Sequence, residues 1–198
     1  MKSWQRIAAG RPPAGAGSDA GGASDSDDTR SGFDDLRRSL AGLLEREPDS
    51  PLLVRASLEA LLDAFVTRAQ QRRGALGLVV FELDDWKALR ERAGESGFAS
   101  HISMFGRELR RRVRSSDEIG RFGEGQIAAV LPGCEPQTLG AVSERLRAAL
   151  EALELAFGAQ TLRPSIIVAS LSASPRPGSS GPARLLEELA DALDLASR

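Results

Sequence analysis

Cysteine and histidine are almost absent from the sequence, which contains only Cys134 and His101. Single copies exclude a disulfide framework and a Cys/His metal cluster, and they fit a reducing compartment. The sequence also lacks any apolar run near the roughly 18 residues that a membrane-spanning helix needs. Its first residues lack the apolar core of a secretory signal. We therefore expect a cytoplasmic protein that does not insert into membranes.

Lysine is nearly missing too, since the chain has only Lys2 and Lys87. The 26 Lys and Arg residues face 28 Asp and Glu residues, and the formal net charge is −2. This balance argues against a general binder of nucleic acid or of anionic membranes, because both require a net basic face. Almost all basic side chains are arginines, whose planar fork suits bidentate contacts to phosphate and to guanine edges.

The beginning of the chain differs in composition from the rest. Residues 10–32 are rich in Gly, Ala, Ser, Pro and Asp and have no large apolar residue, so residues 1–32 are expected to form a disordered tail. Within this tail, residues 1–9 form a short apolar island around Trp4 and Ile7. The island is either a frayed end of the chain or a docking peptide for an unknown protein partner.

A short apolar stripe follows the tail and consists of Phe33, Leu36, Leu40 and Leu43. This heptad-like pattern predicts a helical segment over residues 33–48, ended by Pro48. Two heptads are too few to establish a coiled coil. The segment is therefore either a helical stalk that forms a homodimer or a helix that packs on its own domain.

From residue 49 onward the pattern alternates between helices and strands. Helices are expected near 51–72, 85–93, 97–113, 136–154 and 184–196, and strands at Leu76–Leu83, Glu118–Phe122, Gln126–Leu131 and Ser165–Leu171. The two middle strands flank a Gly-Glu-Gly turn, which indicates a hairpin. The run 172–181, of Ser, Pro and Gly, predicts a loop. A helical crossover combined with a hairpin indicates an α+β fold, with a sheet covered by helices.

The hairpin carries the first of several family motifs. Residues 121–127 read Arg-Phe-Gly-Glu-Gly-Gln-Ile, and with Leu131-Pro132 they resemble the R-Y-G-G-D-E-F…L-P signature of the GGDEF domain of diguanylate cyclases. Residues 81–94, Phe-Glu-Leu-Asp-Asp-Trp-Lys followed by Arg90-Glu91 and Gly94, are similar to D-x-D-x-F-K-x-x-N-D-x-x-G. Further likenesses follow in family order at Asp49…Arg55, Ser165–Ala169 and Ala190…Arg198. The resemblance covers residues 49–198 and implies a nucleotidyl-cyclase-like domain, with a central sheet of about five strands.

The same resemblance places several departures in the family's active site. They are Gly125 and Gln126 at the acidic letters of GGDEF, Glu124 at its second glycine, and Arg90 and Ala99 at the residues that read guanine. Joining two GTP molecules needs metal-binding carboxylates and a base. Glycine has no side chain and glutamine cannot accept a proton, although Glu82, at the first Asp of D-x-D, remains an oxygen donor. We therefore expect a degenerate domain that is not an enzyme, with no catalytic residue, no metal and no cofactor.

A second motif lies just before the hairpin. Arg114-Ser-Ser-Asp117 resembles the family's inhibitory site, R-x-x-D, whose second arginine corresponds by position to Arg145. Arginine can donate a fork to guanine O6 and N7 while its charge faces a phosphodiester, and aspartate can accept from the guanine N1–H and amine. The resemblance implies that these three residues bind cyclic di-GMP, as an intercalated dimer. Alternatively, Arg114 only closes a helix, Asp117 pairs with a nearby arginine, and Arg145 is a solvated helix residue.

The motifs and the departures together predict a bacterial, non-catalytic receptor that binds cyclic di-GMP and regulates a protein partner. Two other functions stay open on the sequence alone. One is a dimeric scaffold that needs no ligand. The other is a residual diguanylate cyclase or a GTP-binding pseudoenzyme.

Overall fold

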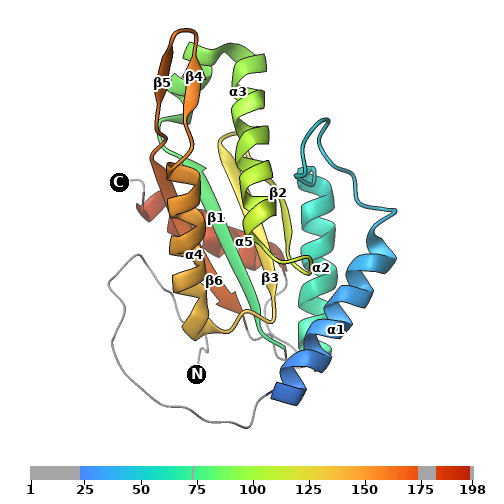
Figure 1. Cartoon of the computed structure of the whole chain (residues 1–198). Coiled ribbons are helices and arrows are strands. Elements are labelled where there is room, and N and C mark those ends of the chain that lie inside the picture. Colours follow the sequence, from blue (N-terminus) through green and yellow to red (C-terminus); the bar gives the residue numbers. More distant parts are fainter. Residues whose placement is uncertain (1–22, 73, 174–181, 197–198) are drawn as a thin grey trace.

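The computed structural model of the chain describes residues 23–72, 74–173 and 182–196 (Figure 1). In chain order its elements are α1 (Ala23–Leu40), α2 (Arg55–Arg72), β1 (Leu76–Leu83), α3 (Trp86–Arg112), β2 (Glu118–Gly123), β3 (Gln126–Pro132), α4 (Pro136–Glu151), β4 (Leu155–Phe157), β5 (Gln160–Leu162), β6 (Ile166–Ala173) and α5 (Pro182–Ala196). Several predictions fall outside the described residues: the apolar island at 1–9, the rest of the tail up to residue 22, most of the loop predicted over 172–181, and the last two residues of the closing motif.

The central sheet has the strand order β2-β3-β1-β6, and each neighbouring pair is antiparallel. β1 therefore lies inside the sheet, where Val79 pairs with Ala129 of β3 and with Ser170 of β6. Alternate residues of β1 face two different cores: Leu76, Leu78 and Val80 face one, and Val79, Phe81 and Leu83 face the other. Burial on both faces explains why this strand is a continuous apolar run rather than an alternating one.

Helices cover both faces of the sheet, which gives three layers (Figure 1). Leu61 and Phe65 of α2 and Leu189 of α5 pack on one face, beside α1. Phe105 of α3 and Leu146 of α4 pack on the other. The predicted α+β fold, with a sheet covered by helices, is confirmed. No helix in the part of the chain that the structure describes is both long and apolar enough to cross a membrane.

The central sheet contains four strands within the described residues, rather than about five. β4 and β5 form a separate two-stranded sheet that the sequence analysis did not predict. α4 ends at Glu151, before the predicted residue 154, and Gly158 turns the chain with a φ of 61°. The hairpin packs on α3, where Nε2 of His101 lies 3.1 Å from the carbonyl O of Ala156. Such short strands give too brief an alternation of apolar residues to be recognised beside a helix.

The start of α1 corrects one prediction. The helix begins at Ala23, so the prediction of a disordered tail is wrong for residues 23–32. That prediction weighed only the composition of the segment itself. A helix extends at little cost once part of it is anchored, and α1 is anchored by Phe33. This side chain is fully buried, with its ring 5.2 Å from the ring of Phe65 in α2.

The end of α1 corrects a second prediction, because the helix stops at Leu40 rather than at Pro48. Leu36 and Leu40 pack against the same core as Phe33. Leu43, the last residue of the apolar stripe, lies in the following turn and is 76% exposed. In the structure the helical part of residues 33–48 packs on its own domain, which is one of the two alternatives, and formation of a homodimer through this segment stays a prediction.

The elements that carry the family motifs agree more closely with the sequence. The two helices predicted near 85–93 and 97–113 form one element, α3, which is broken at Gly94 by a φ of 70° and a ψ of 170°. Glycine adopts this conformation without the steric cost that other residues incur. The predicted hairpin is confirmed, since β2 and β3 pair from Glu118↔Val130 to Gly123↔Gln126. Its register shifts between Arg121 and Gly123, just before the turn that corresponds to GGDEF.

Candidate functional site

The R-x-x-D segment forms a tight turn between the end of α3 and the start of β2. The amide of Asp117 donates to the carbonyl O of Arg114 (3.2 Å), and the amide of Arg114 donates to Oδ2 of Asp117 (2.8 Å). Oγ of Ser116 donates to Oδ1 of Asp117 (3.2 Å). Asp117 is buried, whereas Arg114 is exposed. Asp117 therefore closes its own turn, and the side chain of Arg114 remains accessible to a ligand.

The environment of Asp117 favours its neutral form. Burial raises the pKa of this carboxyl, and the hydrogen bonds from Arg114 and Ser116 and the charges of Arg114 and Arg110 oppose the shift only in part. A carboxylate has about four lone-pair positions, and the turn uses two of them. The turn thus leaves two lone-pair positions of the Asp117 carboxylate unused, although the side chain is buried in this arrangement.

Arg145, on α4, reaches the same end of α3. Its Nη2 donates to the carbonyl O of Arg112, 3.5 Å away. Both Arg145 and Arg114 are exposed, and no residue that the structure describes forms an ion pair with either. The structure therefore brings Arg145 to the residue two positions before Arg114. The two guanidiniums add positive charge, and that of Arg114 acts on a nearby carboxyl, that of Asp117.

Arg110 contributes to this region in a way that the sequence analysis missed. Its Nη1 donates to the carbonyl O of Asp117 (2.8 Å), and its Nη2 donates to the carbonyl O of Arg114. Burial lowers the pKa of Arg110, and the charges of Glu118 and Asp117 oppose this shift. Basic residues near the end of a helix often bind its last carbonyl groups. The position of Arg110 in the last turn of α3 was the signal that could have identified it.

The turn between β2 and β3, together with the end of β1, forms a second candidate site. The amide of Leu83 donates to the carbonyl O of Gly125 (2.9 Å), which joins the turn to β1. Nε2 of Gln126 donates to Oε2 of Glu82 (2.7 Å). Gln126, at the position of the second acidic residue in the GGDEF motif, thus donates a hydrogen bond to Glu82, at the position of the first Asp in the D-x-D motif.

Gly125 lies against Trp86, the first residue of α3. A Cβ atom at position 125 would be 2.6 Å from Cβ of Trp86 and 2.8 Å from its Cδ1. Ordinary contacts between carbon atoms are about 3.5–4.0 Å. Trp86 also packs on Phe98, with ring centroids 6.2 Å apart. A carboxylate at position 125 would have no room unless Trp86 or the turn moved.

Two other departures from the family bind each other. Nη1 of Arg90 lies 2.6 Å from Oε2 of Glu124, and its Nε lies 2.7 Å from Oε1 of Glu95. The hydrogen bond to Glu95 contributes most to a raised pKa of Arg90. Ala99 is exposed on α3 and adds no polar group. The positions that the resemblance assigns to guanine recognition are thus held by an arginine that pairs with two carboxylates and by an alanine.

The residues at this turn do not fit the divalent metal that the family's reaction uses. Within the described residues, no group of three or more His, Cys, Asp or Glu side chains could hold a metal ion. Glu82 offers a carboxylate, but this group already accepts a hydrogen bond from Gln126. Gly125 offers no ligand.

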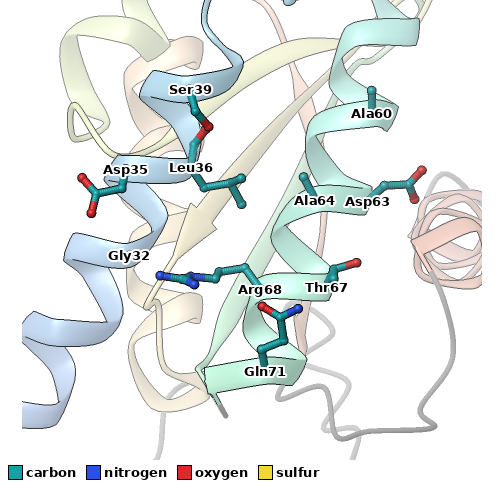
Figure 2. Close-up of a pocket in the computed structure, with 10 residues that line it drawn as sticks. All are labelled: Gly32, Asp35, Leu36, Ser39, Ala60, Asp63, Ala64, Thr67, Arg68 and Gln71. Carbon is teal, nitrogen blue, oxygen red and sulfur yellow. The ribbon is translucent and has the colours of Figure 1, made fainter.

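The R-x-x-D turn does not line either of two depressions elsewhere on the surface. A depression of about 750 Å³ lies between α1 and α2, where Leu36 points toward α2 and Arg68 extends toward Gly32 (Figure 2). Another, of about 480 Å³, is lined by residues beside the hairpin turn, among them Arg55 and Gln126.

Comparison with known proteins identifies the family. A profile described as "Diguanylate cyclase, GGDEF domain" matches residues 50–196. The chain is 31% identical over 116 residues to the diguanylate cyclase DgcP of Pseudomonas aeruginosa. This match covers 59% of the chain but only 17% of DgcP, so the chain spans a small part of that relative's length.

Solved structures share the fold at low sequence identity. The GGDEF domain of FimX from Pseudomonas aeruginosa is 20% identical and superposes with a TM-score of 0.70, covering 77% of this chain and 93% of that one. The GGDEF domain of DgcB from Caulobacter crescentus, solved in complex with c-di-GMP, is 16% identical with a TM-score of 0.68, covering 78% and 93%. Because the family profile matches well over half of the sequence, the chain belongs to the diguanylate cyclase GGDEF-domain family.

Proposed function

We propose that this GGDEF domain is a non-catalytic receptor for cyclic di-GMP in the bacterial cytoplasm and that it regulates a protein partner. One observation carries the proposal. Arg145 contacts the carbonyl O of Arg112, which sets its guanidinium beside the turn made by Arg114 and Asp117. Two exposed arginines and a turn closed by the Asp117 carboxylate thus belong to the same end of α3, and these are the types of group that a cyclic guanine dinucleotide needs.

The charges on this surface suit the ligand. Arg111 and Arg112 both pair with Glu108, so their charge is partly neutralised. Arg114 and Arg145 form no ion pair with any residue that the structure describes. Their charge is thus available to the phosphodiesters of cyclic di-GMP. Their planar forks can also donate to O6 and N7 of guanine, which an ammonium group does less specifically.

The hairpin turn supports the non-catalytic part of the proposal. A GTP triphosphate at this turn would meet the carboxylate of Glu124 and would have to compete with its ion pair to Arg90. A metal ion would find the Glu82 carboxylate hydrogen-bonded to Gln126 and no second carboxylate at position 125. The departures from the family thus have partners inside the protein, and they leave neither the charge nor the space that the reaction requires.

Calorimetry on the full chain tests the proposal directly. We expect cyclic di-GMP to bind as a stacked pair, and we expect no binding of GTP with magnesium. Hydrogen bonds to charged groups contribute roughly 1.5–3 kcal/mol each, so Arg114→Ala and Arg145→Ala should each raise Kd by about 10- to 100-fold. Arg111→Ala is the matched control, because Arg111 lies in the same arginine run but pairs with Glu108.

Ligand selectivity tests the role of Asp117 separately. Asp117→Ala should weaken the binding of cyclic di-GMP and reduce its preference over cyclic di-AMP, because adenine lacks the N1–H that a carboxylate accepts. If Arg111→Ala weakens binding as much as Arg114→Ala, the contact is a diffuse basic patch and the specific site is wrong. If the wild-type chain binds no cyclic dinucleotide, the scaffold function takes the place of the receptor function.

A further inference from the structure

A buried carboxylate lies directly beside the R-x-x-D turn. Glu118 follows Asp117 as the first residue of β2, and it is only 1% exposed. Three arginines from separate segments surround its carboxylate: Nη1 of Arg37 at 3.3 Å, Nη2 of Arg46 at 3.0 Å and Nη1 of Arg110 at 3.9 Å. Arg37 belongs to α1, Arg46 to the loop after α1, and Arg110 to α3.

These three arginines compensate for the burial of the Glu118 carboxylate. A carboxylate loses its hydration when it is buried, and it stays charged inside a protein only where cations and hydrogen bonds replace the water. If one arginine moves away, the charge of Glu118 has to be compensated by the other two. Because Arg37 is in α1, the position of that helix determines whether Arg37 can compensate the charge of Glu118 (Figure 1).

Arg110 connects this cluster to the turn. The guanidinium that approaches Glu118 also donates to the carbonyl groups of Asp117 and Arg114. These two carbonyls belong to the residues proposed to bind the ligand. The chain of contacts thus runs without a gap from the ligand-binding turn through Arg110 and Glu118 to Arg37 in α1.

We propose that Arg110 is a positioning residue for the cyclic di-GMP site and that Glu118 couples occupation of this site to the docking of α1. The inference rests on the proposed function. A ligand that fixes the Arg114–Asp117 turn also fixes the carbonyls that hold Arg110, and it thereby favours the arrangement in which Glu118 binds Arg37. Coupling of this kind is reciprocal, so loss of the α1 contact weakens ligand binding. A partner that pulled α1 from the domain would release the ligand.

The test combines ligand affinity with hydrogen exchange of α1 amides, in the full chain with and without cyclic di-GMP. The variant is Arg37→Gln, and the control is Arg38→Gln in the next position, which removes an exposed pair with Asp35 and an exposed hydrogen bond to the carbonyl O of Asp34. Ligand should slow exchange in α1 of the wild type and of the control, but not in Arg37→Gln. Coupling energies typically change affinity by about 5-fold or more. We expect Arg37→Gln to raise Kd by about 5-fold, and Arg110→Gln to raise it by about 10-fold.

The failure of this inference can be told from the failure of the proposed function. Suppose that the wild type binds cyclic di-GMP, that Arg37→Gln and Arg38→Gln have equal Kd values, and that the ligand does not change hydrogen exchange in α1. Glu118 then has a structural role only. A purely structural cluster would lower the thermal midpoint without changing the response of α1 to ligand. If the wild type does not bind at all, the proposed function fails and the coupling fails with it.

Discussion

The close approach of Gly125 and Trp86 yields a prediction whose size follows from the structure. Replacing Gly125 with alanine places a Cβ atom 2.6 Å from Cβ of Trp86, about 1 Å inside an ordinary contact. The clashing atom of Trp86 lies next to the backbone of the first residue of α3, so a change of rotamer cannot relieve the clash. Overpacking of this kind costs roughly 1–3 kcal/mol. Each 1 kcal/mol shifts the midpoint of a domain of this size by about 2–4 °C. Gly125→Ala should therefore lower the thermal midpoint by about 2–12 °C.

Thermal unfolding followed by circular dichroism would measure this shift. Gly42→Ala is the control, because Gly42 lies in an exposed turn and a Cβ atom there meets nothing within 4 Å. The control should unfold at the wild-type temperature or slightly above it, since alanine restricts the unfolded chain. Equal midpoints for the two variants would refute the steric argument. The same argument predicts that Gly125→Asp, even combined with Gln126→Glu, does not create cyclase activity while Trp86 remains.

Three further predictions concern other parts of the chain. The wild-type protein should form no cyclic di-GMP from GTP with magnesium or manganese, and product above a heat-killed control in chromatography would contradict this. Phe33→Ala should destabilise the domain by about 3–5 kcal/mol in urea unfolding, because Phe33 is fully buried, whereas Leu43→Ala, at 76% exposure, should change little. Burial raises the pKa of Asp117. The contribution of this shift to the free energy of unfolding is fully present below the ordinary aspartate pKa of about 3.9. It is lost as the pH rises through the pKa of Asp117 in the folded protein. As the pH rises from 4 to 8, the thermal midpoint of Asp117→Asn should therefore increase relative to that of the wild type. A difference between the two midpoints that stays constant over this range would show that Asp117 titrates normally.

The elements with strong local signals could be predicted from the sequence. β1 is a long apolar run, and the hairpin has a glycine turn between two apolar strands, so both were located almost to the residue. Their order also fixed the α+β class, because a helical crossover followed by a hairpin permits few other sheets. The β4–β5 hairpin was missed because strands as short as Leu155–Phe157 show no clear period.

The errors at α1 have a different origin, which is tertiary packing. Nothing in the composition of residues 23–32 favours a helix. The helix depends on Phe33 fitting against Phe65, a contact between residues far apart in the chain. The end of the helix was also misplaced, because Leu43 continues the apolar stripe but meets no partner in the structure and is exposed. Apolar spacing predicts which residues could be buried, and only the fold decides which of them are.

The candidate site shows the same limit at the level of single side chains. The R-x-x-D spacing predicted Arg114 and Asp117, and position in the family pattern predicted Arg145. Neither could indicate that Asp117 is buried or that Arg110 binds the carbonyls of the turn. Glu118 carried no signal at all, because a glutamate that begins a strand is usually exposed, and its three arginines come from distant parts of the sequence. Charge pairs of this kind depend on the tertiary fold.

The pairing of charges also distinguishes the two candidate sites from each other. At the hairpin turn, the charged and polar groups that replace family residues are satisfied within the protein, Arg90 by Glu124 and Gln126 by Glu82. At the R-x-x-D turn, Asp117 is satisfied by its own turn, but the guanidiniums of Arg114 and Arg145 are not matched by any described carboxylate. An anion that binds an arginine without an ion-pair partner adds a favourable charge interaction without breaking an existing one. The two turns therefore differ in what they gain from a nucleotide. The hairpin turn would have to break internal pairs to admit one, whereas under the proposed function the R-x-x-D turn would gain an anionic partner for Arg114 and Arg145.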